Sequence, residues 1–378
     1  MISKHVLALV SLGAIGTGAA AQSSVTLFGV IDLTLAYGTG HGPISTSKTQ
    51  LTHSGYQSSR IGFRGVEDLG GGNFASFWLE GAIAPDVGDA GGATFPTNRG
   101  AAVESNGLNF NRRSFVSLGG KWGEVRLGRE YVPTFWSRNL FDPFLINGST
   151  AALTTLGAVG LGTSVTPLPA GQSVRGVVAR AANSITYIMP SGPTGLYGQV
   201  AYWSGENTRG QGRSPSDGNG AGARLGYKSG GFDVAIAYDR TSYAKTATTG
   251  VFKTGNVGGS YDFGPVKAFA LYVYDHKEST VAVTGRGWLL GGSVPVGVGD
   301  VRFSYSRYEI KSGSFKPKTD LIALGYAHFL SKRTTLYANV ARASNRDGAA
   351  YALNGSSVSA APYRTSSVGY DFGVRHTF

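Results

Sequence analysis

Cysteine is absent from this 378-residue chain, and methionine occurs only twice. A chain without cysteine has no disulfide scaffold and no thiolate chemistry. No stretch contains the ~20 consecutive apolar residues that a membrane-spanning helix needs. The formal net charge is +12, but it comes without a lysine-rich run or an amphipathic basic helix. The charge therefore does not predict nucleic-acid binding.

Catalytic and metal-binding motifs are also missing. No Gly-x-Ser-x-Gly elbow occurs. The histidines show no ligand spacing; they are His5, His41, His53, His276, His328 and His376. We therefore expect no enzyme, no metal and no other cofactor. An outer-membrane enzyme whose catalytic residues meet only in space stays open as an alternative.

The chain begins with the pattern of an export signal. Lys4 precedes a short apolar run over residues 6–15, and three alanines at 19–21 offer a cleavage site. We predict a signal peptide over residues 1–21. The mature chain, 22–378, is predicted to be one domain.

What the chain has in abundance is glycine and aromatic residues, with 58 Gly, 19 Tyr and 19 Phe. This composition indicates an all-β, turn-rich protein. Residues 24–38 alternate between an apolar face, which includes Leu27, Ile31 and Leu35, and a mixed face that includes Asp32. Such a strand fits either a membrane barrel or one sheet of a soluble β-sandwich.

The connections between strands favour the barrel. We expect about sixteen strands, over residues 24–38, 60–69, 73–83, 111–118, 123–131, 183–189, 196–204, 221–228, 232–241, 251–263, 266–275, 286–294, 301–310, 319–330, 334–343 and 366–378. Tight glycine-rich links alternate with longer polar links, such as 276–285 and 311–318, along the whole chain. A transmembrane antiparallel β-barrel has such short periplasmic turns and long outside loops. A soluble sandwich has no reason to sort its loops by length in this way.

The last predicted strand ends on an aromatic residue. Tyr370, Phe372, Val374 and Phe378 share one face, and the sequence stops at Phe378. Aromatic residues gather at membrane interfaces. We predict that Phe378 closes the barrel against the first strand.

One loop, over residues 132–182, is far longer than the others. It contains many glycines and prolines, and a loop of this length inside a compact domain is usually functional. We predict that it folds into the lumen and narrows the pore as a constriction loop. Its aromatics are too apolar for a solvated tail. We expect them to pack the loop against the wall, with a sliding surface for solutes as the alternative: Phe135, Trp136, Phe141 and Phe144.

Several segments resemble the general diffusion porins of Gram-negative outer membranes. They include SVTLFGVID at 24–32, SRIGFRGVEDLGGG at 59–72, GEVRLGR at 123–129 and GVRHTF at 373–378. The resemblance implies a homotrimer of sixteen-stranded barrels in the bacterial outer membrane, each with an inward third loop. It further implies contact with membrane lipid and lipopolysaccharide, and passive diffusion of small hydrophilic solutes and inorganic anions.

Strand parity identifies the residues expected to line the constriction. Ile61 and Phe63 mark the lipid face, which turns Arg60 and Arg64 inward. The same argument turns Arg113 inward and leaves Arg112 ambiguous unless a bulge intervenes. A charge on the lipid face would cost ~2–4 kcal/mol at the bilayer midplane.

Two charged residues of the long loop complete the predicted constriction. Arg180 lies at the foot of the returning loop, and Asp142 is the only acid between 132 and 182. An excess of arginine over acid lowers the barrier for anions, so we predict a general porin with anion preference. The alternatives are a substrate-specific channel for small anions or sugars, and arginines that only fasten the loop to the wall.

Overall fold

The computed structural model describes residues 24–90, 98, 107–151, 179–207, 214–247, 249–359 and 364–378. Over these residues the chain forms one sheet of nineteen strands, together with one α-helix and one 3-10 helix. The helices that the structure describes are too short or too polar to cross a membrane. The predicted signal peptide lies outside the described residues.

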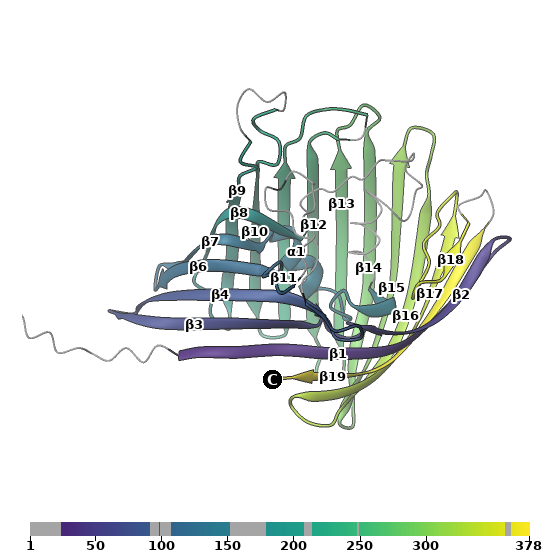
Figure 1. The fold of residues 1–378 in the computed structure, drawn as a ribbon, viewed down its shortest axis with the longest axis horizontal. Helices are drawn as coiled ribbons and strands as arrows, with labels where there is room; N and C mark the ends of the chain where they lie inside the picture. The colour runs from purple at the N-terminus through teal and green to yellow at the C-terminus, as the bar shows by residue number, and fades with distance from the viewer. Residues whose placement is uncertain are drawn as a thin grey trace, which may run out of the picture.

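The sheet closes into an antiparallel cylinder. Three of the nineteen strands belong to the long loops and leave sixteen for the wall; they are β2 (Ser45–His53), β5 (Asp89–Ala90) and β18 (Ser357–Val358). In Figure 1, β1, β3 and β4 run across the view while β11 to β14 stand nearly upright, as strongly tilted strands of one cylinder do. The wall strands are β1 (Ser24–His41), β3 (Arg60–Gly70), β4 (Asn73–Ala84), β6 (Arg113–Gly120), β7 (Gly123–Tyr131), β8 (Arg180–Ile188), β9 (Gly195–Trp203), β10 (Gly220–Ser229), β11 (Phe232–Thr241), β12 (Phe252–Asp262), β13 (Lys267–Lys277), β14 (Val283–Val296), β15 (Gly299–Ser312), β16 (Lys318–Phe329), β17 (Thr334–Arg346) and β19 (Thr365–Thr377).

Closure joins the first strand to the last. β1 pairs with β3 over residues 24–30 and with β19 over residues 30–41, and Figure 1 shows β19 beside β1. Gly29 and Phe378 exchange two backbone hydrogen bonds, of 3.1 and 3.2 Å. The Phe378 ring lies directly over Gly29, where a side chain would collide with it. The ladder therefore has no free edge at the seam.

The alternation predicted for the first strand is confirmed. Leu27, Ile31 and Leu35 are exposed on the outer face of β1, at 51%, 39% and 55%. Asp32 and Thr34, on the opposite face, are fully buried. The outer surface is thus apolar and the inner surface polar, as a barrel in a bilayer requires.

The predicted sorting of connections by length is also confirmed. Turns of two residues, such as 71–72 and 121–122, join strands at one end, and the loops that hold β2, β5 and β18 lie at the other. Two outer links are shorter than predicted, at 278–282 and 313–317. There, β13 to β16 continue their pairing past the predicted ends.

The longest loop folds into the lumen, as predicted. After β7 it forms α1 (Pro133–Leu140) against β9 to β12, and then η1 (Gly148–Thr150) against β16, β17 and β19. The helix was not predicted, because eight residues with several polar β-branched or short side chains form no stable helix alone. Pro133 fits the first turn, where its missing N–H costs nothing. Residues 152–178 of the loop lie outside the described part.

A buried ion pair fixes the end of α1 to the wall. Arg138 Nη2 donates to Asp275 Oδ1 of β13 at 2.7 Å and to Thr254 Oγ1 of β12 at 2.6 Å. Tyr308 donates its hydroxyl to the other Asp275 oxygen at 2.8 Å. The Arg138 and Asp275 side chains are 1% and 0% exposed. A buried charge is tolerated only with such partners.

Two further carboxylates bind the loop on either side of this pair. Asp239 of β11 accepts hydrogen bonds from the backbone N–H and the hydroxyl of Thr134. Asp371 of β19 accepts from the Ser149 backbone N–H and hydroxyl at 2.9 and 2.6 Å. The loop therefore contacts the wall at points far apart around the cylinder, which holds it across the pore.

Arg138→Met should release the loop. The substitution leaves Asp275 buried without its cation, and breaking such a pair costs ~3–5 kcal/mol. The free energy of unfolding in detergent micelles, followed by tryptophan fluorescence in urea, should fall by about that amount. Lys253→Met is the matched control, because Lys253 and Glu278 form an exposed ion pair. Equal losses in the two variants would contradict the role given to Arg138.

Candidate functional site

A cavity of about 480 Å³ lies between the inward loop and the wall. Leu145, Ile146 and Asn147 of the loop line one side, and residues of β3, β4, β7 and β8 line the other. Leu145 and Ile146 have positive φ values of 52° and 62°. A β-branched residue in this conformation is strained, and such strain is common at functional sites.

Four arginines line this cavity, and three of them are called here the arginine cluster: Arg60, Arg112 and Arg180. The Tyr131 hydroxyl accepts from Arg112 Nη2 at 3.0 Å and from Arg180 Nη2 at 3.2 Å. Glu80 Oε1 lies 2.5 Å from Arg112 Nε and 3.7 Å from Arg60 Nε. Among the described residues this carboxylate is the only one within ion-pair distance of Arg60 or Arg112, and none lies within that distance of Arg180, so the cluster carries excess positive charge.

The fold brings these residues together because they occupy the same end of neighbouring strands. Arg60 and Arg180 begin β3 and β8, Arg112 directly precedes β6, and Tyr131 ends β7. Strands β3, β4, β6, β7 and β8 are consecutive in the sheet. The side chains thus converge at one height of the wall, although the sequence separates them by up to 120 residues.

Arg113 was predicted to line the constriction, and it does reach the cavity. Its positive charge, however, is paired with a carboxylate. Arg113 donates to both Glu130 oxygens, at 2.9 and 2.6 Å, and only 7% of the residue is exposed. Arg126 binds Glu130 and Glu124 at 2.8 Å each. These four side chains form a neutral row next to the arginine cluster.

Arg64 and Asp142 lie apart from the arginine cluster. Arg64 is exposed on the lumen side, with its guanidinium carbon 5.4 Å from the ring centroids of both Phe28 and Trp78. Asp142 is 2% exposed, and its side chain accepts the Phe144 N–H at 2.9 Å. Asp142 thus shapes a turn of the loop. The partner of Arg138 is the wall residue Asp275.

The four loop aromatics divide into two pairs. Phe141 and Phe144 are 0% and 5% exposed and belong to the hydrophobic core between loop and wall. Phe135 stacks on Tyr131 with ring centroids 4.8 Å apart, while Trp136 meets the same ring edge-on at 5.3 Å. Trp136 is only partly buried and lines the lumen.

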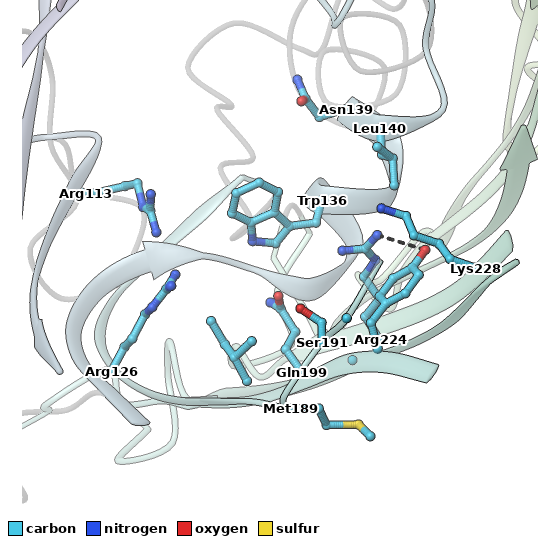
Figure 2. Close-up of a pocket in the computed structure, with 14 residues that line it drawn as sticks. Arg113, Arg126, Trp136, Asn139, Leu140, Met189, Ser191, Gln199, Arg224 and Lys228 are labelled. Atoms are coloured by element: carbon cyan, nitrogen blue, oxygen red, sulfur yellow. Dashed lines mark hydrogen bonds between the residues drawn. The ribbon is translucent and has the colours of Figure 1, made fainter. Parts of the chain in front are cut away.

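A second cavity, of about 410 Å³, lies on the short-turn side of α1 and is called here the short-turn cavity. Met189, Ser191 and Gly192 of the β8–β9 connection line it. Arg113, Trp136 and Asn139 line both cavities. The lumen therefore offers basic side chains on either side of Trp136. Figure 2 shows Trp136 between Arg113 and Arg126 on one side and Arg224 and Lys228 on the other.

Sequence reasoning missed Arg112, Glu80 and Tyr131. Arg112 turns inward because the chain bends there, just before β6 begins. The alternation rule holds only inside a regular strand, so the rule left Arg112 undecided. Glu80 and Tyr131 lie on predicted strands. The only sequence feature that could have identified them is their position on the lumen-facing side of the strand alternation. The described residues contain no His, Asp or Glu group that could hold a metal ion.

Comparison with known proteins gives a consistent result. A family model described as "Gram-negative porin" matches residues 8–373. The chain is 34% identical to outer membrane porin protein 32 of Delftia acidovorans, with 100% of both chains covered. It is 26% identical to an outer membrane porin of Bordetella pertussis, covering 91% of this chain and 95% of that one.

Solved structures agree. An anion-selective porin from Comamonas acidovorans superposes with a TM-score of 0.76 at 32% identity, covering 94% of this chain and 100% of that one. OmpT of Vibrio cholerae has a TM-score of 0.60 at 12% identity, covering 94% and 98% of the two chains, which supports the fold alone.

Tyr131→Phe should destabilise the site without changing its shape. Two guanidinium N–H groups lose their shared acceptor, which costs about 1–2 kcal/mol. Tyr202→Phe is the control, because Tyr202 is 50% exposed on the outer face. Urea unfolding in detergent micelles would compare the two variants. If both lose the same free energy, the Tyr131 hydroxyl does not hold the arginine cluster.

Proposed function

Because this chain belongs to the Gram-negative porin family, we propose that its water-filled outer-membrane channel passes small hydrophilic solutes with a preference for anions. Solutes cross passively, down their gradients. The chain acts on none of them chemically. The inward loop limits their size, and the charges at the constriction bias which ions pass.

The arginine cluster is the observation that supports anion preference. Arg60 and Arg112 share one carboxylate, Glu80, within ion-pair distance, and Arg180 has no carboxylate within that distance among the described residues. The row formed by Arg113, Arg126 and their glutamates is close to neutral and leaves this excess uncompensated. A narrow water-filled passage with low-dielectric walls concentrates such a field, which attracts anions and repels cations.

The proposal assigns roles to the predicted constriction residues. Arg60 and Arg180 supply the field together with Arg112, while Arg113 supports it through its pairing with Glu130. Arg64 extends positive charge along the lumen wall. Asp142, Phe141 and Phe144 hold the loop in shape, and Phe378 closes the barrel seam.

The proposed assembly is a homotrimer embedded in lipid and lipopolysaccharide. The aliphatic and aromatic side chains exposed on the outer face support contact with lipid and with neighbouring copies. One of the structural neighbours, OmpT of Vibrio cholerae, is described in a trimer form. Export would remove residues 1–21, so that the mature chain begins at Gln22.

Neutralising the arginine cluster should weaken anion preference. We expect Arg60→Gln and Arg180→Gln each to lower the chloride-to-potassium permeability ratio by about fivefold, since one partly screened charge contributes ~1 kcal/mol. Reversal potentials in planar bilayers under a salt gradient measure the ratio. Arg286→Gln is the control, because Arg286 lies on the outer face beside Tyr274. A cation-preferring wild-type channel would overturn the proposed function.

The preference of the channel for anions should also fall as the salt concentration rises. The Debye length shrinks from ~10 Å at 0.1 M to ~3 Å at 1 M, so the field of the arginine cluster reaches less of the passage. Reversal potentials at a fixed tenfold gradient, centred on low and then on high salt, test this. A ratio independent of salt would indicate selection by size or by direct binding.

A further inference from the structure

The short-turn cavity differs from the cavity at the arginine cluster because apolar side chains line it next to its charged ones. Leu140 of α1 and Ile188 and Met189 at the end of β8 contribute aliphatic surface, and Trp136 contributes an indole ring. Fully hydrated inorganic ions gain nothing from such surface. An organic solute does gain from it, because burying apolar area is favourable.

The basic side chains of this cavity differ in whether a carboxylate already binds them. Arg113 and Arg126 are bound by Glu130 and Glu124. Arg224, by contrast, has no carboxylate within ion-pair distance among the described residues. Its guanidinium carbon lies 4.8 Å from the Tyr197 ring centroid. Its Nη2 donates a long hydrogen bond, of 3.4 Å, to the Tyr197 hydroxyl.

Lys228 stands beside Arg224 in this corner of the lumen. Its Nζ lies 3.5 Å from Asp233, and 44% of its side chain is exposed. Tyr197 donates its hydroxyl to the same Asp233 at 2.5 Å. The corner therefore holds two cations against one carboxylate, and that carboxylate is already shared with a hydroxyl. One positive charge remains for an incoming solute.

Trp136 presents an aromatic surface to the same space. Tyr131 meets the indole edge-on, at an interplanar angle of 72°. Figure 2 shows the Trp136 indole projecting from α1 toward Arg113 and Arg126, with Arg224, Lys228 and Leu140 on the opposite side of the same cavity. An aromatic solute that enters this cavity can stack on the indole or meet it edge-on. Both arrangements stabilise a pair of rings by more than the burial of their apolar area alone.

We infer that the short-turn cavity is a binding site for aromatic monocarboxylates. The carboxylate binds Arg224 and Lys228, and the ring lies against Trp136 and the aliphatic lining. A cavity of about 410 Å³ holds a single benzene-sized solute with room for water. This inference rests on the proposed channel function and names a class of solute that the channel retains on its way through.

Benzoate and acetate provide the test, because they share the carboxylate and differ in the ring. Each is added to the short-turn side of single channels carrying chloride current in a planar bilayer. Benzoate should block at a concentration about tenfold lower than acetate, from ring stacking and burial together. In Arg224→Gln the benzoate concentration for half-block should rise about tenfold, and in Trp136→Leu about fivefold.

Arg302→Gln is the matched control. Arg302 is another lumen arginine over a tyrosine ring, 4.7 Å from the Tyr56 centroid, but it belongs to β15 on a different part of the wall. Benzoate block should be unchanged in this variant. Equal block by benzoate and acetate in the wild-type channel, with anion preference intact, overturns the inference and leaves the proposed function standing. Cation preference overturns the proposed function first.

Discussion

The wall depends on one constraint, that every backbone N–H and C=O facing hydrocarbon must find its partner inside the wall. A sheet meets this constraint only when its first and last strands pair, and here β1 joins β19 over residues 30–41. Gly29 makes the seam possible, because the Phe378 ring occupies the space that a side chain would need. Once the cylinder is closed, strand alternation assigns every residue to lipid or to lumen, so the polar chemistry must lie inside.

The inward face then has its own constraint, because buried charges need partners. Asp239, Asp275 and Asp371 obtain theirs from the inward loop, through Thr134, Arg138 and Ser149. These acids face the lumen by parity, but all three are buried and present no exposed carboxylate to the passage. Among the described residues, the arginines of the cluster have no ion-pair partner on the loop, and only Arg60 and Arg112 share the wall carboxylate Glu80. Positive bias in the pore thus follows from where the acids are bound, as much as from the net charge of the chain.

This also explains how far the sequence predicts the molecule. Strand number, turn placement and the inward loop follow from residue alternation and glycine spacing, which are local. Arg112 could not be assigned, because a bend just before β6 breaks the alternation. The Arg138–Asp275 pair joins residues 137 positions apart, and no local pattern encodes such a contact. The helix α1 was missed since its stability comes from the wall against which it packs.

Trp136 shows why the loop and the charges must be considered together. Its ring lies between two basic cavities, and its position depends on α1, which the Arg138–Asp275 pair holds against β12 and β13. A solute at the arginine cluster therefore shares a cavity with this ring. Charge determines which solutes enter, and the aromatic surface determines how long an organic one stays. Because the buried Arg138–Asp275 pair helps to hold that surface, loosening the loop would change selectivity for organic anions without altering any charge in the arginine cluster.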